Sequence, residues 1–166
     1  LEHVLIDGDT DATASTNINA IDTTPSGSEA FLLVNGFRKI PLVTLTANSR
    51  DGGALDVGDF LETLKLMGTG GLAALDQGRV GFIIDRHTHW KALELDDIKT
   101  RDVFSGATLE AGRLSNIWGY PVYVAGQIAK GGSGKSNTAG KVDADTAGNN
   151  TKGQILAVRW DRWQMG

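Results

Sequence analysis

Apolar residues recur at helical spacing in one stretch of the chain, residues 56–67. Asp56 can cap the first turn of a helix here, and Asp59 favours the positive end of the helix dipole. Glycines at 68, 70 and 71 form a stop signal. The pattern predicts a helix from Asp56 to Met67 whose apolar face comprises Val57, Phe60, Leu61, Leu64 and Met67.

A strand followed directly by a second helix is predicted next. Residues 79–85, RVGFIID, form an apolar run typical of a strand. Asp85 can then cap a helix that begins RHTHWKALEL. From that helix we expect Trp90, Leu93 and Leu95 to face inward.

Three further strands are predicted by short apolar runs. Two of them, RLSNIW (113–118) and YPVYVAGQI (120–128), are joined at Gly119, and the third is QILAVRW (154–160). Pro121 should lie at a strand start or edge because proline has no N–H for a sheet hydrogen bond. Helices and strands that do not alternate regularly indicate an α+β fold.

The rest of the chain is less regular. Residues 1–6, LEHVLI, either end a helix or start a strand, and Pro41 argues against a helix in the apolar stretch 30–43. Polar, glycine-rich sequence at 7–29, 46–53 and 130–152 predicts loops.

Composition narrows the classes of function. The chain has 166 residues, enough for one core, and 22 of them are glycine, which favours many turns. The net charge of −4 gives no broad electrostatic attraction for nucleic acid, and the lack of cysteine excludes disulfides and thiolate metal sites. No apolar run approaches the length of a membrane span.

One motif suggests a nucleotide site. AKGGSGKS, residues 129–136, fits a relaxed phosphate-binding loop after the strand PVYVAGQI. A working loop needs a helix that starts at the GKS, but the glycines and asparagines that follow make a helix unfavourable. A surface loop is the preferred interpretation.

Two stretches mimic calcium loops. DGDTD places Asp7, Asp9 and Asp11 at alternate positions, and DADTAGNN offers Asp143 and Asp145. Both lack the closing bidentate glutamate that such a loop uses. Solvated acidic loops are therefore expected, with no metal.

No catalytic constellation emerges. His87 and His89 would share a face only on a strand, and on the expected helix they point apart, as surface or capping residues. Asp96 and Asp97 are adjacent and diverge, and there is neither a GxSxG motif nor a cysteine nucleophile. We expect no enzyme activity and no cofactor.

Four tryptophans, Trp90, Trp118, Trp160 and Trp163, are many for a chain of this length. In a net acidic chain, core or subunit-contact roles are favoured over base stacking. The run RWDRW could contact a neighbouring subunit or nucleic acid. The candidate subunit-contact residues are Trp118, Tyr120, Arg159, Trp160, Arg162 and Trp163.

Several segments, in order, resemble the major capsid proteins of tailed bacteriophages. They are IDGDT (6–10), NIN (17–19), NGFRKI (35–40), LDVGDFLETLKLMG (55–68), RVGFIIDRHTHWKALEL (79–95), IKTRDVFSGATLEAGRLSNIWGYPVYVAGQI (98–128) and NTKGQILAVRWDRWQMG (150–166). The most specific are KTRDVFSGATLEAGRLSNIWGYPVYV and the closing segment. These are packing patterns rather than chemical motifs.

The resemblance implies the fold shared with encapsulins, a mixed sheet with flanking helices. Residues 1–29 would be the end of the spine helix and a long loop of the peripheral domain, and 30–128 the core of the axial domain. Residues 129–153 would be a Gly/Asn-rich loop, and 154–166 a strand returning to the peripheral domain. The chain looks like a fragment that lacks the N-terminal arm, the extended loop and most of the spine helix.

The function implied is a structural subunit of a bacteriophage or prophage icosahedral capsid. Copies would assemble as pentamers and hexamers around double-stranded DNA without sequence-specific contact, with scaffold or portal proteins as further partners. The resemblance places the protein in the virion, assembled in the host bacterial cytoplasm, away from membranes. The alternatives are a nucleotide-binding protein using residues 129–136 and a calcium- or glycan-binding module of a phage surface.

Overall fold

A computed structural model describes residues 2–13, 17–18, 27–50, 52–68, 78–99, 114, 116–126, 128, 130–132 and 150–162. The chain forms two compact units. Unit 1 comprises Leu1–Asp51 and Gly126–Gln154, and unit 2 comprises Gly52–Ala125 and Ile155–Gly166. Residues 30–51 thus cluster with 1–29, although the capsid-like segmentation joins them to 52–128. That segmentation stays a prediction.

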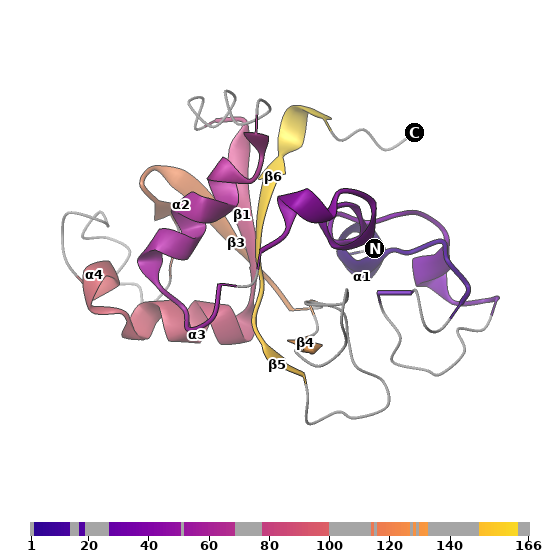
Figure 1. The fold of residues 1–166 in the computed structure, drawn as a ribbon, viewed down its shortest axis with the longest axis horizontal. Coiled ribbons are helices and arrows are strands. Elements are labelled where there is room, and N and C mark those ends of the chain that lie inside the picture. The colour runs from indigo at the N-terminus through magenta and orange to yellow at the C-terminus, as the bar shows by residue number, and fades with distance from the viewer. Residues whose placement is uncertain are drawn as a thin grey trace. The chain divides into compact units, whose positions relative to one another are not determined.

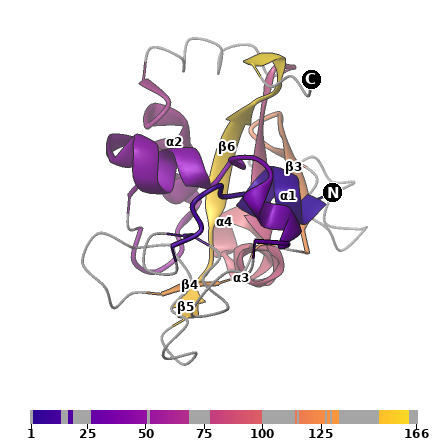
Figure 2. The same cartoon turned by 90° about the vertical axis from the view of Figure 1, so that its right-hand side faces the viewer.

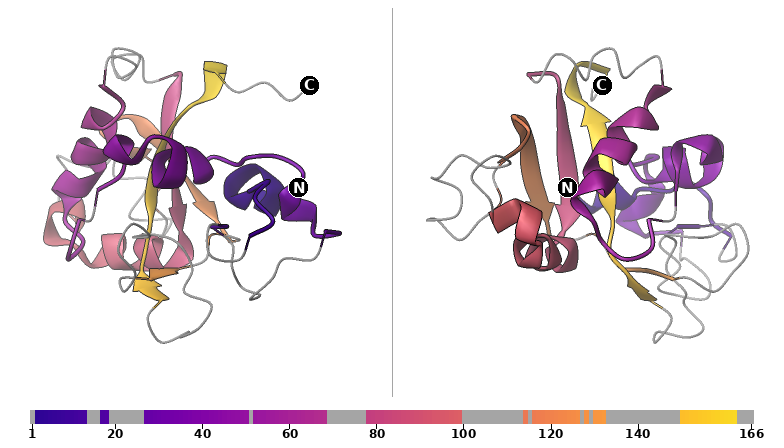
Figure 3. Two further views of the ribbon diagram at one scale, coloured as in Figure 1. Left: turned by 45° about the vertical axis from the view of Figure 1, so that its right-hand side comes forward. Right: turned by 60° about the vertical axis from the view of Figure 1, so that its left-hand side comes forward.

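Unit 2 is built on a four-stranded mixed sheet with the order β2-β3-β1-β6. The strands are β1 (Val80–Asp85), β2 (Asn116–Ile117), β3 (Tyr120–Ala125) and β6 (Ile155–Arg159). β1 pairs with β3 in parallel, with Phe82 opposite Val122, and with β6 antiparallel, with Phe82 opposite Ala157. In Figure 3, right, β3, β1 and β6 lie side by side. The predicted α+β class with a mixed sheet and flanking helices is confirmed.

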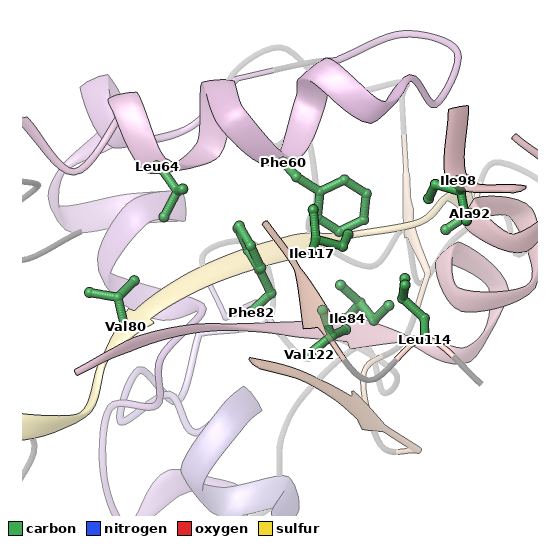
Figure 4. Packing of buried hydrophobic residues seen from close by; sticks show 10 residues of the cluster. All are labelled: Phe60, Leu64, Val80, Phe82, Ile84, Ala92, Ile98, Leu114, Ile117 and Val122. Atoms are coloured by element: carbon green, nitrogen blue, oxygen red, sulfur yellow. The ribbon is translucent and has the colours of Figure 1, made fainter. Parts of the chain in front are cut away.

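Three helices cover the core face of this sheet (Figure 1). They are α2 (Val57–Lys65), α3 (Arg86–Glu94) and α4 (Asp96–Lys99). α2 runs alongside β6 (Figure 2). Figure 4 shows side chains from all three helices pointing toward those of β1, with the Phe60 and Phe82 rings edge to face at 5.3 Å. The buried cluster is Phe60, Leu64, Val80, Phe82, Ile84, Ala92, Ile98, Leu114, Ile117 and Val122.

Both predicted helix caps of unit 2 are confirmed. Asp56 accepts a hydrogen bond from the Gly58 N–H, and the Asp59 carboxylate accepts one from the Asp56 N–H. The Asp85 carboxylate accepts bonds from the His87 and Thr88 N–H groups and from the Thr88 hydroxyl. These bonds satisfy amides that the first turn of a helix leaves without partners.

Two of the side chains predicted to face inward from the helices face solvent instead, so these two predictions are wrong. Leu61 is 44% exposed and Trp90 62% exposed. One residue is a turn of about 100° on a helix, so Leu61 rotates away when Phe60 points to the sheet. On α3, the side chains that are buried are Thr88, His89 and Ala92, which leaves Trp90 on the outer side. Val57, Met67, Leu93 and Leu95 are partly buried against the core, as predicted.

The predicted strands are shorter than their apolar runs. β2 holds only two residues, and β3 ends at Ala125. They form a hairpin around Trp118 and Gly119, whose φ angles are 49° and 81°. Two-residue hairpin turns with positive φ at both positions match the twist of the strands. Pro121 lies near the start of β3, as predicted.

Unit 1 has little regular structure among its described residues. It contains α1 (Glu2–Asp7), short 3-10 helices at Ala30–Leu32 (η1) and Thr46–Asn48 (η3), a π-helical turn at Ile40–Thr44 (η2), and a two-stranded sheet of β4 (Gly131–Gly132) and β5 (Asn150–Lys152). The helix alternative for residues 1–6 is therefore confirmed. The ends of the expected loop 130–152 are paired strands, so that prediction is wrong there.

Pro41 does not exclude a helical turn, contrary to expectation. It lies in the first turn of η2, where its missing N–H costs no helical hydrogen bond. The Leu45 N–H donates to the Ile40 carbonyl to close the turn, at 2.7 Å.

Candidate functional site: a buried charged cluster

Two segments of unit 1 interlock through their backbones. The N–H groups of Phe37 and Arg38 donate to the carbonyls of Leu5 and Ile6 at 2.9 and 3.0 Å. The segment around residues 36–38 thus satisfies carbonyls at the C-terminal end of α1, which lack partners within the helix.

Gly8 and Gly36 make this close approach possible. The Gly36 N–H donates to the Gly8 carbonyl at 2.7 Å, and a Cβ added at Gly36 would lie 2.6 Å from the Gly8 nitrogen and the Ile6 carbonyl oxygen. At Gly8, an added Cβ would lie 2.3 Å from the Val34 carbonyl oxygen. Only glycine lets the two backbones meet at this distance.

Four charged side chains meet beside this contact, and we call Asp7, Asp9, Arg38 and Lys39 the charged cluster. Arg38 Nη1 lies 2.5 Å from Asp7 Oδ1, with both side chains essentially inaccessible. Lys39 Nζ lies 2.7 Å from Asp9 Oδ1, and Lys39 exposes only 11% of its side chain. The cluster contains two acids and two cations, so its charge balances internally.

Neutral groups add further hydrogen bonds to Arg38 and Asp9. Arg38 Nε donates to Gln154 Oε1 at 2.7 Å across 116 residues of sequence. Asp9 also accepts from the N–H groups of Asp11 and Ile18, both at 2.9 Å. The buried Asn17 amide donates to the Asp11 carbonyl at 2.6 Å. A buried charge is tolerated when it is paired and hydrogen-bonded in this way.

The predicted solvated acidic loop is therefore wrong for Asp7 and Asp9, which are 0% exposed. Their carboxylates face the cations Arg38 and Lys39, which stand about thirty residues further along the chain. The Asp11 carboxylate accepts from the Thr13 N–H at 2.8 Å. No group of three or more acidic, histidine or cysteine side chains suited to a metal occurs within the described residues. Asp143 and Asp145 lie outside them.

The sequence contains a sign of the charged cluster, but it does not show which residues pair with one another. Arg38 and Lys39 stand inside an otherwise apolar stretch, AFLLVNGFRKIPLV, where charges are unexpected. Their partners are about thirty residues away, and only the fold identifies which acids they meet.

His87 and His89 lie on α3, as predicted. His89 is buried rather than on the surface, which corrects the prediction. Its Nδ1 has no hydrogen-bond partner, and burial lowers the pKa of its imidazole below the ordinary value of 6.5. The cap of α3 is Asp85, not a histidine.

The candidate contact residues of unit 2 partly pack within that unit. Trp118 and Tyr120 are partly buried against the core. The Trp160 indole lies over Gly81, where an added Cβ would come within 2.9 Å of it, and its ring meets Tyr123 edge to face at 5.5 Å. Arg159 donates two hydrogen bonds to Asp161, at 2.6 and 3.0 Å.

Other predicted features fall wholly or partly outside the described residues. Of the phosphate-loop motif, only Lys130, Gly131 and Gly132 are described. The side chain of Arg162 and all of Trp163 are not. Asp96 and Asp97 lie in the first turn of α4 and are exposed.

Comparison with known proteins gives no relative. No protein-family model, curated protein or solved structure matches the chain. Among the described residues, no helix has both the length and the apolar character needed to cross a membrane.

Proposed function

We propose that the chain is part of a structural subunit of a bacteriophage or prophage capsid, which assembles with copies of itself into an icosahedral shell around double-stranded DNA. One observation carries the proposal. Three capsid-like segments, 79–95, 98–128 and 150–166, contribute all four strands of the sheet in unit 2. A fourth segment, 55–68, supplies α2, which packs Phe60 and Leu64 onto that sheet.

The geometry of the acidic residues favours a structural role over chemistry. Asp7 and Asp9 are buried and paired, so they are not available to a substrate. Asp85 is engaged by the first turn of α3. Each of these carboxylates stabilises the fold locally.

The surface of unit 2 also suits contact between subunits. Tyr123 exposes 56% of its surface beside Trp160, and Arg159 and Asp161 lie in the same region of the chain. Aromatic and arginine side chains are enriched where proteins contact one another. Repeated contacts between identical chains are what a closed shell requires.

Expression of the complete gene product followed by negative-stain electron microscopy tests this function. Closed shells of uniform diameter are the expected result. Folded monomers or dimers that form no shells, even when co-expressed with the products of the neighbouring genes, would contradict it.

Two point variants sharpen the test. Arg162→Glu and Trp163→Ala should lower the yield of shells while circular dichroism shows an unchanged fold. Lys91→Ala, which removes an exposed cation whose partner is Glu94 on the same helix, is the matched control and should assemble normally. Equal shell yields in all three variants would remove residues 162 and 163 from the predicted contacts.

A further inference from the structure

Among the described residues, the two units differ in the balance of apolar and polar side chains that they bury. The interior of unit 2 is an apolar cluster in which Phe60, Phe82 and Ile84 meet (Figure 4). Unit 1 buries few apolar side chains and more polar ones. Its buried side chains are Ile6, Ile18 and Ile128 on the apolar side, and Asp7, Asp9, Asn17, Arg38 and Lys39 on the polar side.

The two segments that carry the charged cluster, residues 7–9 and 36–39, are aligned so that each acid meets one cation. Asp7 and Asp9 flank Gly8, while Arg38 and Lys39 follow Gly36, so the glycine contact aligns each acid with its own cation. A shift of either segment would separate both ion pairs and break the backbone bonds from Gly36, Phe37 and Arg38 together. A buried charge that loses its partner is strongly unfavourable, so a partly opened arrangement is disfavoured.

We propose that the charged cluster acts as a latch, meaning that its ion pairs stabilise the folded form of unit 1. Unit 1 would then open, that is, unfold locally, as one cooperative element while the core of unit 2 stays folded. Regions that bury little apolar surface open locally at a lower free-energy cost than the rest of a protein. Arg38 extends the latch to Gln154 through its Nε–H, so residues 5–13, 17–18, 31–39 and 154 open together. The latch would operate whether or not the chain forms a shell.

Hydrogen exchange of the unmodified full chain in rising, sub-denaturing urea gives the first test. The N–H groups of Gly8, Asp9, Gly36, Phe37 and Arg38 donate hydrogen bonds within unit 1. Their exchange should converge on one common opening at low urea, while the amides of Phe82, Ile83 and Ile84 open only at higher urea. A single opening curve shared by both groups of amides would overturn the proposal.

The variant Asp9→Asn gives the second test, because it leaves the Lys39 ammonium buried without its counter-ion. Its single amide oxygen can still accept from one of the two backbone N–H groups, those of Asp11 and Ile18, that the Asp9 carboxylate binds. The unit 1 amides should exchange about 100-fold faster or more, since breaking one partner of a buried ion pair is strongly destabilising. The exchange rates of the Phe82, Ile83 and Ile84 amides in unit 2 should change by less than about threefold. Equal acceleration in both units, or none in either, would contradict the latch.

A double variant and a surface control separate the charge effect from general damage. Asp9→Asn combined with Lys39→Met removes the lone cation and should recover about tenfold or more of the lost protection. Glu62→Gln breaks an exposed ion pair with Lys65 on α2 and should leave exchange in both units unchanged. Failure of the double variant to recover protection would show that the charge is not what holds unit 1 closed.

Discussion

The Lys39 ammonium lies 2.7 Å from a carboxylate oxygen of Asp9, and that carboxylate is fully buried. In the DGDTD motif, which has three alternating aspartates, Asp9 is therefore paired with Lys39 and Asp7 with Arg38. The cations come from a segment about thirty residues further along the chain. An acidic run that resembles a metal loop acts here as a contact between two backbone segments.

The close contact of Gly36 with the end of α1 should make this position intolerant of a side chain. Gly36→Ala is expected to lower the free energy of unfolding of unit 1 by about 3 kcal/mol, because the new methyl group would overlap backbone atoms that cannot yield. Urea denaturation or hydrogen exchange measures the loss. Gly27→Ala is the control, since nothing lies within 4 Å of the added Cβ, and should change stability by less than about 0.5 kcal/mol.

The neighbouring positions 60 and 61 on α2 should respond very differently to truncation. Phe60→Ala removes a fully buried ring that meets Phe82, and should cost about 3–5 kcal/mol. Leu61→Ala removes a side chain that is 44% exposed, and should cost less than about 1 kcal/mol. Chemical denaturation followed by circular dichroism checks both values. Similar losses at the two positions would mean that the described face of α2 is wrong.

The two aspartate caps should differ in strength. Asp85→Ala is expected to destabilise unit 2 by about 2 kcal/mol, because a buried carboxylate that accepts from two N–H groups and the Thr88 hydroxyl is lost. Asp56→Ala removes an exposed cap and should cost about 1 kcal/mol. Thermal unfolding of the two variants in parallel gives the comparison. A larger loss for Asp56→Ala would contradict the contacts assigned to Asp85.

His89 should make unit 2 less stable as the pH falls. Burial lowers the pKa of His89 in the folded state below 6.5, so below that pH the unfolded chain binds more protons than the folded one. The contribution of His89 to the free energy of unfolding is therefore most favourable above pH 6.5. It falls as the pH is lowered from 6.5 to the pKa of His89 in the folded state. Protonation would also place an N–H at Nδ1, which has no partner.

Unfolding free energies measured between pH 5 and 8 test this dependence. His89→Gln should flatten the curve below pH 6.5, because it removes the imidazole whose pKa burial lowers. If this variant keeps the slope of the unmodified chain, another group is responsible for it.

Local patterns in the sequence determined most elements of unit 2, although not the short helix α4. The spacing of apolar residues placed α2 and β1, and Asp56 and Asp85 marked where helices begin, because caps act on amides only two or three residues away. Gly119 marked where two predicted strands join, and the structure closes them there into a hairpin. An α+β fold could be predicted from these elements alone.

Only the tertiary structure decided which faces those elements bury and which charges meet. Leu61 and Trp90 are apolar, yet the rotation of each helix against the sheet leaves them outside. Asp7 and Asp9 are charged, yet the approach of Gly8 to Gly36 brings cations that allow them inside. The physical reason is that helix propensity and capping depend on neighbours in sequence, whereas burial and ion pairing depend on neighbours in space.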